Sequence, residues 1–121
     1  MENSCSCACG LPELTSENIT TVSPDEFRER IYQPEFYLLD VRTPDEFKTG
    51  HIKGAHNLDV TNPDFEELAK KELPEDKVIA VYCGSGKRSA MAANKLDLLH
   101  FKVLNLEGGL AAWKNAGLPV T

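Results

Sequence analysis

The chain has 121 residues and a mass of 13.4 kDa, which is the size of one compact domain and too short for two full ones. Hydrophobic residues make up 41% of the chain and charged residues 26%, so the composition excludes wholesale disorder. The net charge of −6 has the wrong sign for a general binder of nucleic acid or anionic membranes, and no apolar run approaches the roughly 18 residues of a membrane span.

Residues 1–18 are predicted to be a flexible tail, because they lack apolar periodicity and contain no Lys or Arg. Their start has neither the basic nor the apolar region of a secretory signal, so we expect a cytoplasmic protein, or a periplasmic one if a signal has been removed. Three of the four cysteines, Cys5, Cys7 and Cys9, lie in this tail. Their spacing matches C-x₂-C metal sites poorly, and four interpretations stay open: soft-metal binding, a thiol that reaches Cys83, a processing remnant, or a tail of unknown role.

From residue 19 onward, predicted strands alternate with predicted helices. Unbroken apolar runs indicate strands buried on both faces, and the strongest of them is 78–82. Two capping boxes with proline at the first helical position, S-P-D-E and T-P-D-E, are expected to open two helices. Asn62-Pro63-Asp64 is expected to open a third helix with the same combination of cap and proline. In chain order the predictions are a strand at 19–22, a helix at 23–32, a strand at 36–39, a helix at 43–50, a helix from 62, a strand at 78–82, a helix at 88–99, a strand at 103–106 and a helix at 109–115.

This alternation predicts one α/β domain over residues 19–121, with a mainly parallel sheet and helices on both faces. In such folds ligands bind where strands end and loops lead into helices. The loop that follows the strand at 78–82 is therefore the first candidate site.

That loop begins at Cys83 and reads C-G-S-G-K-R-S through residue 89. Its glycines are expected to let backbone N–H groups converge into an anion-binding nest, and the following helix adds its positive N-terminal end. Lys87 and Arg88 add two full charges. These features predict a lowered pKa for Cys83 and an accessible nucleophile that meets an anionic substrate. The alternative is a buried structural cysteine, which the polar residues after it argue against.

Two other interpretations of the loop fail on spacing. A nucleotide P-loop needs four residues between its first glycine and Gly-Lys-Ser/Thr, and Arg88 stands where the hydroxyl residue is required. A zinc site fails because no second cysteine or histidine lies within finger spacing of Cys83. We expect neither a metal nor an organic cofactor.

Three segments resemble the single-domain rhodanese (thiosulfate sulfurtransferase) family, and the resemblance extends over roughly residues 19–121. The segments are L-D-V-R-T-P-D-E-F at 39–47 with G-H-I-K-G-A-H-N at 50–57, the loop at 83–88, and L-E-G-G-L-A-A-W at 106–113 with G-L-P-V at 117–120. All three occur in order and at ordinary spacing. The resemblance implies a three-layer sandwich, in which helices cover both faces of a mostly parallel five-stranded sheet.

The same resemblance implies a reaction. Cys83 would attack the outer sulfur of thiosulfate, release sulfite and hold the sulfur as a persulfide, which cyanide, a thiol or a protein would then accept. The loop N–H groups would stabilise the sulfur, and Lys87 and Arg88 would hold the sulfonate. The candidate substrate-binding residues are Gly84, Ser85, Gly86, Lys87, Arg88, Ser89 and Arg42.

Loop length and the cysteine itself separate the alternatives. Related phosphatases and arsenate reductases have five residues between cysteine and arginine, whereas four lie between Cys83 and Arg88. The shorter loop suits one sulfur atom better than a tetrahedral oxyanion. A non-catalytic docking module of this family would usually lack the cysteine, so a sulfurtransferase is favoured over both alternatives.

Asp40 and Arg42 follow the strand at 36–39, on the edge that is expected to hold the Cys83 loop. Arg42 is expected either to add positive field near Cys83, with Asp40 orienting its neighbours, or to form a structural ion pair with Asp40. The ion pair is favoured.

Three further features are interpreted as structural. His51 and His56 are not assigned as bases, because a thiolate that the loop forms needs none. Trp113 is assigned to the core, and residues 107–109 to a turn that the geometry requires.

Overall fold

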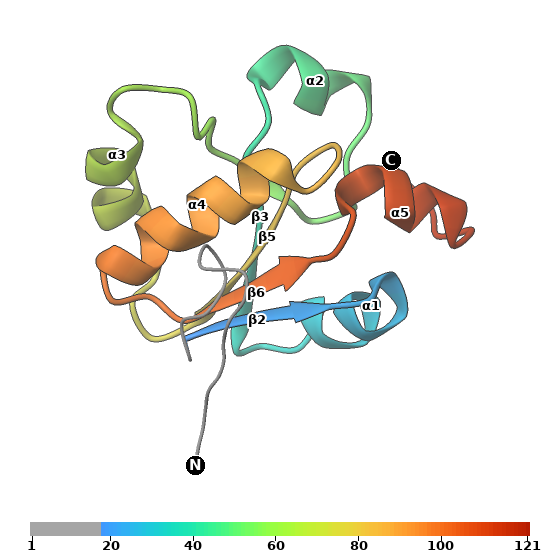
Figure 1. Ribbon diagram of the computed structural model, residues 1–121, viewed down its shortest axis with the longest axis horizontal. Helices are drawn as coiled ribbons and strands as arrows, with labels where there is room; N and C mark the ends of the chain where they lie inside the picture. The colour runs from blue at the N-terminus through green and yellow to red at the C-terminus, as the bar shows by residue number, and fades with distance from the viewer. Residues whose placement is uncertain (1–17) are drawn as a thin grey trace, which may run out of the picture.

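The computed structural model describes residues 18–121, in which a parallel sheet lies between two layers of helices (Figure 1). The predicted tail, including Cys5, Cys7 and Cys9, lies outside the described residues except for Asn18. In chain order the elements are β2 (Ile19–Val22), α1 (Pro24–Ile31), β3 (Phe36–Asp40), α2 (Pro44–Thr49), β4 (His56–Asn57), α3 (Phe65–Glu72), β5 (Val78–Tyr82), α4 (Lys87–Leu98), β6 (Val103–Leu106) and α5 (Gly109–Asn115).

The five strands follow the order β2-β6-β5-β3-β4, and every pairing in this sheet is parallel. This confirms the predicted α/β class. The residues alone did not reveal β4, because its two residues, His56 and Asn57, are too few to form an apolar run. Parallel strands bring their carboxyl ends to one edge, so the segments that follow β3, β5 and β6 meet there.

Strand side chains alternate between two apolar layers, as expected for strands that are buried on both faces. Helices α3 and α4 cover one face, where the core cluster includes Leu39, Phe65, Val81 and Leu96. Helices α1 and α5 cover the other face, where the cluster includes Phe27, Tyr82, Leu104 and Trp113. Trp113 is buried, which confirms its assignment to the core.

Helices α1 and α2 begin as their capping signals predict. The Ser23 and Thr43 hydroxyls accept hydrogen bonds from the backbone N–H groups of Glu26 and Glu46, and proline is the first helical residue in both. Unlike the other helices, α2 contains no buried residue. Polar contacts at its two ends therefore hold α2 in place.

The predicted start of the third helix is wrong. Helix α3 begins at Phe65, and the side chain of Asn62 instead accepts a hydrogen bond from the N–H of Asp64 at 2.9 Å. This local turn takes the place of a cap-plus-proline start, because an Asn side chain can satisfy a backbone donor two residues on without a helix. Along residues 18–121, none of the helices combines the length and apolar character that crossing a membrane demands.

Replacing Phe27 tests the layer formed by α1 and α5. Phe27 is fully buried and meets Trp113 edge to face, with ring centroids 6.3 Å apart. We expect Phe27→Ala to lower the free energy of unfolding by about 3–5 kcal/mol in urea titrations, because the lost ring leaves a cavity. Leu98→Ala is the control, since this side chain is 78% exposed and its loss should change stability by less than about 0.5 kcal/mol. Equal losses in the two variants would contradict this assignment.

Candidate active site

Strand β5 ends at Tyr82, and Cys83 begins the loop that leads into α4. The backbone N–H of Gly86 donates a hydrogen bond to Cys83 Sγ at 3.0 Å. Gly86 has a φ of +103°, a conformation that favours glycine, and it forms the N-cap of the 12-residue helix α4. Gly84 has no positive φ, so the tight turn requires only the second of the two loop glycines.

Cys83 is buried, with 0% exposure, and belongs to the same core cluster as Val41 and Val81. The expectation of an accessible thiol is therefore wrong. Ser85 and Lys87 are exposed, so the polar character of this segment belongs to the outer part of the loop and not to its first residue. The side chain of Cys83 therefore has no exposed surface in the described structure.

The first turn of α5 holds the backbone of the loop. The N–H groups of Leu110 and Ala111 donate to the carbonyls of Cys83 at 2.7 Å and Gly84 at 3.0 Å. Gly109 lies so close that a Cβ atom there would be 2.5 Å from the Cys83 carbonyl oxygen and 2.8 Å from that of Gly84. The turn before α5, predicted as a geometric requirement, thus also supports the loop.

Ser89 was predicted among the substrate-binding residues, and the structure places it inside the loop instead. It is buried, and its hydroxyl donates to the Gly86 carbonyl at 3.2 Å. This contact braces the residue whose N–H reaches the sulfur. The Ser89 hydroxyl is therefore engaged with the backbone of the loop.

Arg88 forms a two-pronged ion pair with Glu46 of α2. Its Nη1 and Nη2 donate to Glu46 Oε1 and Oε2 at 2.7 and 3.0 Å. The Arg88 guanidinium lowers the pKa of Glu46 to about 2, and Glu46 in turn raises the pKa of Arg88. The sequence marks Glu46 only as a capping residue, because its 42-residue separation from Arg88 leaves no local pattern.

Charges of both signs surround the loop. Glu46, the Cys83 sulfur and Asp59 all contribute to the raised pKa of Arg88, so carboxylates as well as cations lie nearby. Lys87 is exposed and forms no ion pair within residues 18–121. The cationic pocket expected from the sequence is therefore reduced, since Glu46 neutralises one of its two positive charges.

Asp40 and Arg42 form a buried ion pair, the arrangement that the sequence analysis favours for them. Arg42 Nε and Nη2 donate to the Asp40 carboxylate at distances from 2.7 to 3.1 Å, and the two side chains are only 7% and 0% exposed. Arg42 also donates to the Gly50 carbonyl, and Asn57 Nδ2 donates to the carbonyls of Asp40 and Arg42. The Arg42 guanidinium thus contacts Asp40 and Gly50, and it lies 6.0 Å from the centroid of the Tyr82 ring.

Both histidines of this edge make packing contacts. The His51 ring stacks on Phe47 with centroids 3.8 Å apart, and the His56 ring stacks on Tyr37 at 4.4 Å. His51 Nδ1 also lies 2.9 Å from the Phe47 carbonyl oxygen. Within residues 18–121, no three His, Cys, Asp or Glu side chains gather in a way that could hold a metal ion.

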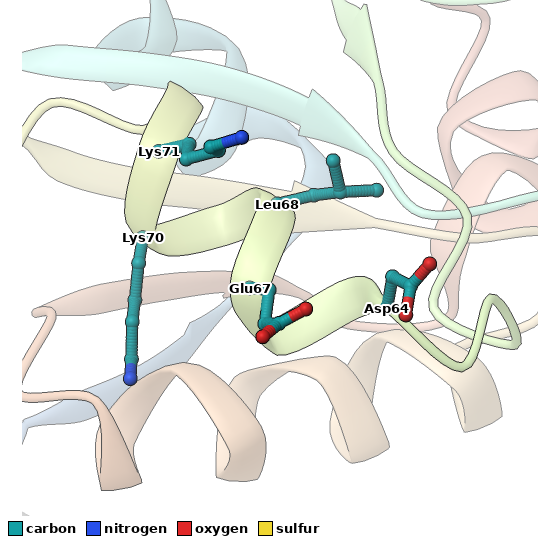
Figure 2. Close-up of a pocket in the computed structure, with 5 residues that line it drawn as sticks. All are labelled: Asp64, Glu67, Leu68, Lys70 and Lys71. Carbon is teal, nitrogen blue, oxygen red and sulfur yellow. The ribbon is translucent and has the colours of Figure 1, made fainter.

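A separate pocket lies along α3 and contains no residue of the Cys83 loop (Figure 2). It is lined by Asp64, Glu67, Leu68, Lys70 and Lys71. Figure 2 shows that Lys70 extends away from Lys71, so the two positive charges do not converge on one point. The pocket contains no cysteine, serine or histidine.

Replacing Gly109 tests the contact between α5 and the loop. We expect Gly109→Ala to destabilise the fold by well over the roughly 1–2 kcal/mol that a left-handed alanine costs, because the new Cβ would also collide with the two carbonyls. Gly117→Ala is the matched control, since Gly117 also has a positive φ, of +80°, but has nothing within 4 Å of its Cβ position. Thermal unfolding of both variants measures the difference, and equal losses would rule out the collision.

Acidification tests the ion pair between Arg88 and Glu46. The folded-state pKa of Glu46 is about 2, against an ordinary value of 4.5, so its stabilisation is complete above pH 4.5 and is lost as the pH falls toward 2. The Glu46 side chain is 41% exposed, so we expect an effect below about 1 kcal/mol. Wild type should melt above Glu46→Gln at pH about 6, and the gap should close near pH about 2. A gap that does not change with pH would show that the carboxylate charge contributes nothing.

Comparison with known proteins identifies relatives over most of the chain. A sulfurtransferase of Allochromatium vinosum is 34% identical over 104 residues, which cover 84% of this chain and 94% of that protein. Thiosulfate sulfurtransferase 16, chloroplastic, of Arabidopsis thaliana is 41% identical over 93 residues, which cover 67% and 76%. An uncharacterised protein of Synechocystis is 37% identical over 108 residues, and the chain spans only 57% of its length.

Structure and family comparisons agree with these relatives. A rhodanese-related protein from Thermoplasma volcanium superimposes with a TM-score of 0.74 at 32% identity, covering 84% of this chain and 97% of that one. The family described as the rhodanese-like domain matches residues 23–116. The chain therefore belongs to the rhodanese-like domain family, as its three sequence segments predicted.

Proposed function

We propose that the protein is a sulfurtransferase that takes the sulfane sulfur of thiosulfate, or of a similar persulfide donor, onto Cys83 and passes it to a thiophilic acceptor. The hydrogen bond from the Gly86 N–H to Cys83 Sγ, at 3.0 Å, carries this proposal. A backbone donor in that position stabilises negative charge on sulfur, whether as a thiolate or as a persulfide. Membership of the family and its sulfurtransferase relatives support the same conclusion.

In the first half-reaction the Cys83 thiolate attacks the outer sulfur of thiosulfate. The sulfur–sulfur bond of thiosulfate breaks, its electron pair leaves with sulfite, and the outer sulfur stays on Cys83 as a persulfide anion. No proton transfer is needed, so the site requires no histidine base. The exposed Lys87 side chain is suited to attract the anionic donor to the outer face of the loop.

In the second half-reaction an acceptor attacks the outer sulfur of the persulfide. The bond to Cys83 Sγ breaks, its electron pair returns to Cys83 as thiolate, and cyanide leaves as thiocyanate or a thiolate as a new persulfide. The burial of Cys83 protects the persulfide intermediate, because a covered sulfur is shielded from oxidation. The N-terminal end of α4 adds its positive dipole to the same atom.

Different features of the loop argue against the two alternative functions. Four residues between Cys83 and Arg88 argue against a phosphatase or arsenate reductase, and the presence of Cys83 argues against a module that only docks a partner. Neither alternative predicts that Cys83 takes up sulfur, so one measurement separates the sulfurtransferase from both.

Incubation with thiosulfate tests the proposal. We expect wild type to gain about 32 Da in intact mass, one sulfur atom, and to release sulfite. Cys83→Ser should do neither, because it lacks the attacking thiolate. A variant with serine in place of Cys5, Cys7 and Cys9 is the matched control and should behave as wild type. Folded, reduced wild type that takes up sulfur neither from thiosulfate nor from a persulfide donor would overturn the proposal, and uptake that persists in Cys83→Ser would assign the sulfur to another cysteine.

A further inference from the structure

The guanidinium of Arg88 is already paired with a carboxylate in the absence of a sulfur donor. Both of its terminal nitrogens are bound to Glu46, at 2.7 and 3.0 Å. A sulfonate would use the same planar fork, because arginine binds carboxylates and other oxyanions through paired N–H groups. A donor that uses this same pair of N–H groups must therefore displace Glu46.

Glu46 is also held in position from its own side. Its Oε1 accepts hydrogen bonds from the Thr43 N–H at 3.2 Å and from the Thr43 hydroxyl at 3.1 Å. The far end of α2 is tied down as well, since Arg42 donates to the Gly50 carbonyl. The Glu46 carboxylate is thus fixed toward the loop, and withdrawing it breaks contacts on α2.

The charge of the sulfur donor determines how strongly the negative groups of the site repel it. Thiosulfate is a dianion and would enter a site that holds the Glu46 carboxylate, with Asp59 nearby and the Cys83 sulfur itself negative during attack. Repulsion between like charges grows with the charge of the donor. A persulfide with an uncharged tail brings at most one negative charge and has no sulfonate for Arg88 to bind.

We propose that Glu46 determines donor specificity, by occupying Arg88 and so favouring a persulfide with an uncharged tail over dianionic thiosulfate. The inference rests on the sulfurtransferase function proposed above. In the favoured step the Cys83 thiolate attacks the terminal sulfur of R–S–SH. The sulfur–sulfur bond of the donor breaks, the proton and electron pair leave as R–SH, and Cys83 keeps the sulfur as a persulfide anion. Glu46 acts through Arg88 and is a positioning residue.

Glu46→Gln tests this role, because it removes the charge and keeps an acceptor for the capping bonds. Sulfur loading of Cys83 is followed by mass with thiosulfate and with 2-hydroxyethyl persulfide, and kcat/KM is measured for each donor. We expect Glu46→Gln to raise kcat/KM for thiosulfate on the order of 5- to 10-fold and to change that for the persulfide by less than about 2-fold. The ratio between donors is a readout that a purely structural role would not move.

Glu66→Gln is the matched control, because it removes a carboxylate of similar exposure that pairs with Lys95 at 3.0 Å. It should keep the wild-type donor ratio. An unchanged ratio in Glu46→Gln, or an equal shift in Glu66→Gln, would overturn the role of Glu46 while sulfur loading continues. Failure of both donors to load wild type would overturn the proposed function and this inference with it.

Discussion

The first turn of α5 lies directly against the backbone of the Cys83 loop, and the geometry of the site depends on this contact. The N–H groups of Leu110 and Ala111 bind the carbonyls of Cys83 and Gly84, which fixes the orientation of those peptide groups. With the loop held between β5 and α5, the N–H of Gly86 reaches the sulfur. The two glycines of this contact serve different needs: Gly86 supplies a backbone conformation, and Gly109 leaves room for the carbonyls.

Ion pairing, and not the count of charges, determines the field at the sulfur. The chain carries −6 overall, yet Lys87 and Arg88 follow Cys83 almost directly, which suggests a strongly positive loop. The structure pairs Arg88 with Glu46 and buries Arg42 against Asp40, so two of the three cations of this edge are already matched. The Gly86 N–H and the dipole of α4 remain as positive partners of the sulfur, while the Lys87 side chain is exposed.

Much of the fold could be predicted because it depends on local signals. Apolar runs marked the long strands, and the capping boxes at Ser23 and Thr43 marked two helix starts that the structure confirms. The apolar strand at 78–82 and the residues after it located the Cys83 loop, and the family resemblance supported that choice. The residues alone missed strand β4, because its two residues depend on pairing with Leu39 and Asp40, which no local pattern encodes.

The site was harder to predict than the fold, for the same physical reason. The burial of Cys83 depends on packing with residues from other elements, such as Val41, and the sequence that follows it is polar. The sequence assigned Glu46 only to a helix capping box, whereas its carboxylate binds Arg88 as well as Thr43. Ser89 has a hydroxyl that could bind a ligand, and no local sequence pattern indicates that it donates a hydrogen bond to the Gly86 carbonyl instead.

The strand order has a consequence for how the protein is made. In the described sheet β2 is hydrogen-bonded to β6, so the first strand of this sheet to be synthesised cannot pair until the last one has been made. Helix α5, which follows β6, also holds the backbone of the Cys83 loop. A nascent chain therefore has its Cys83 thiol before it has the helix that holds this loop in place. The geometry of the candidate site is completed only when the last described helix has folded.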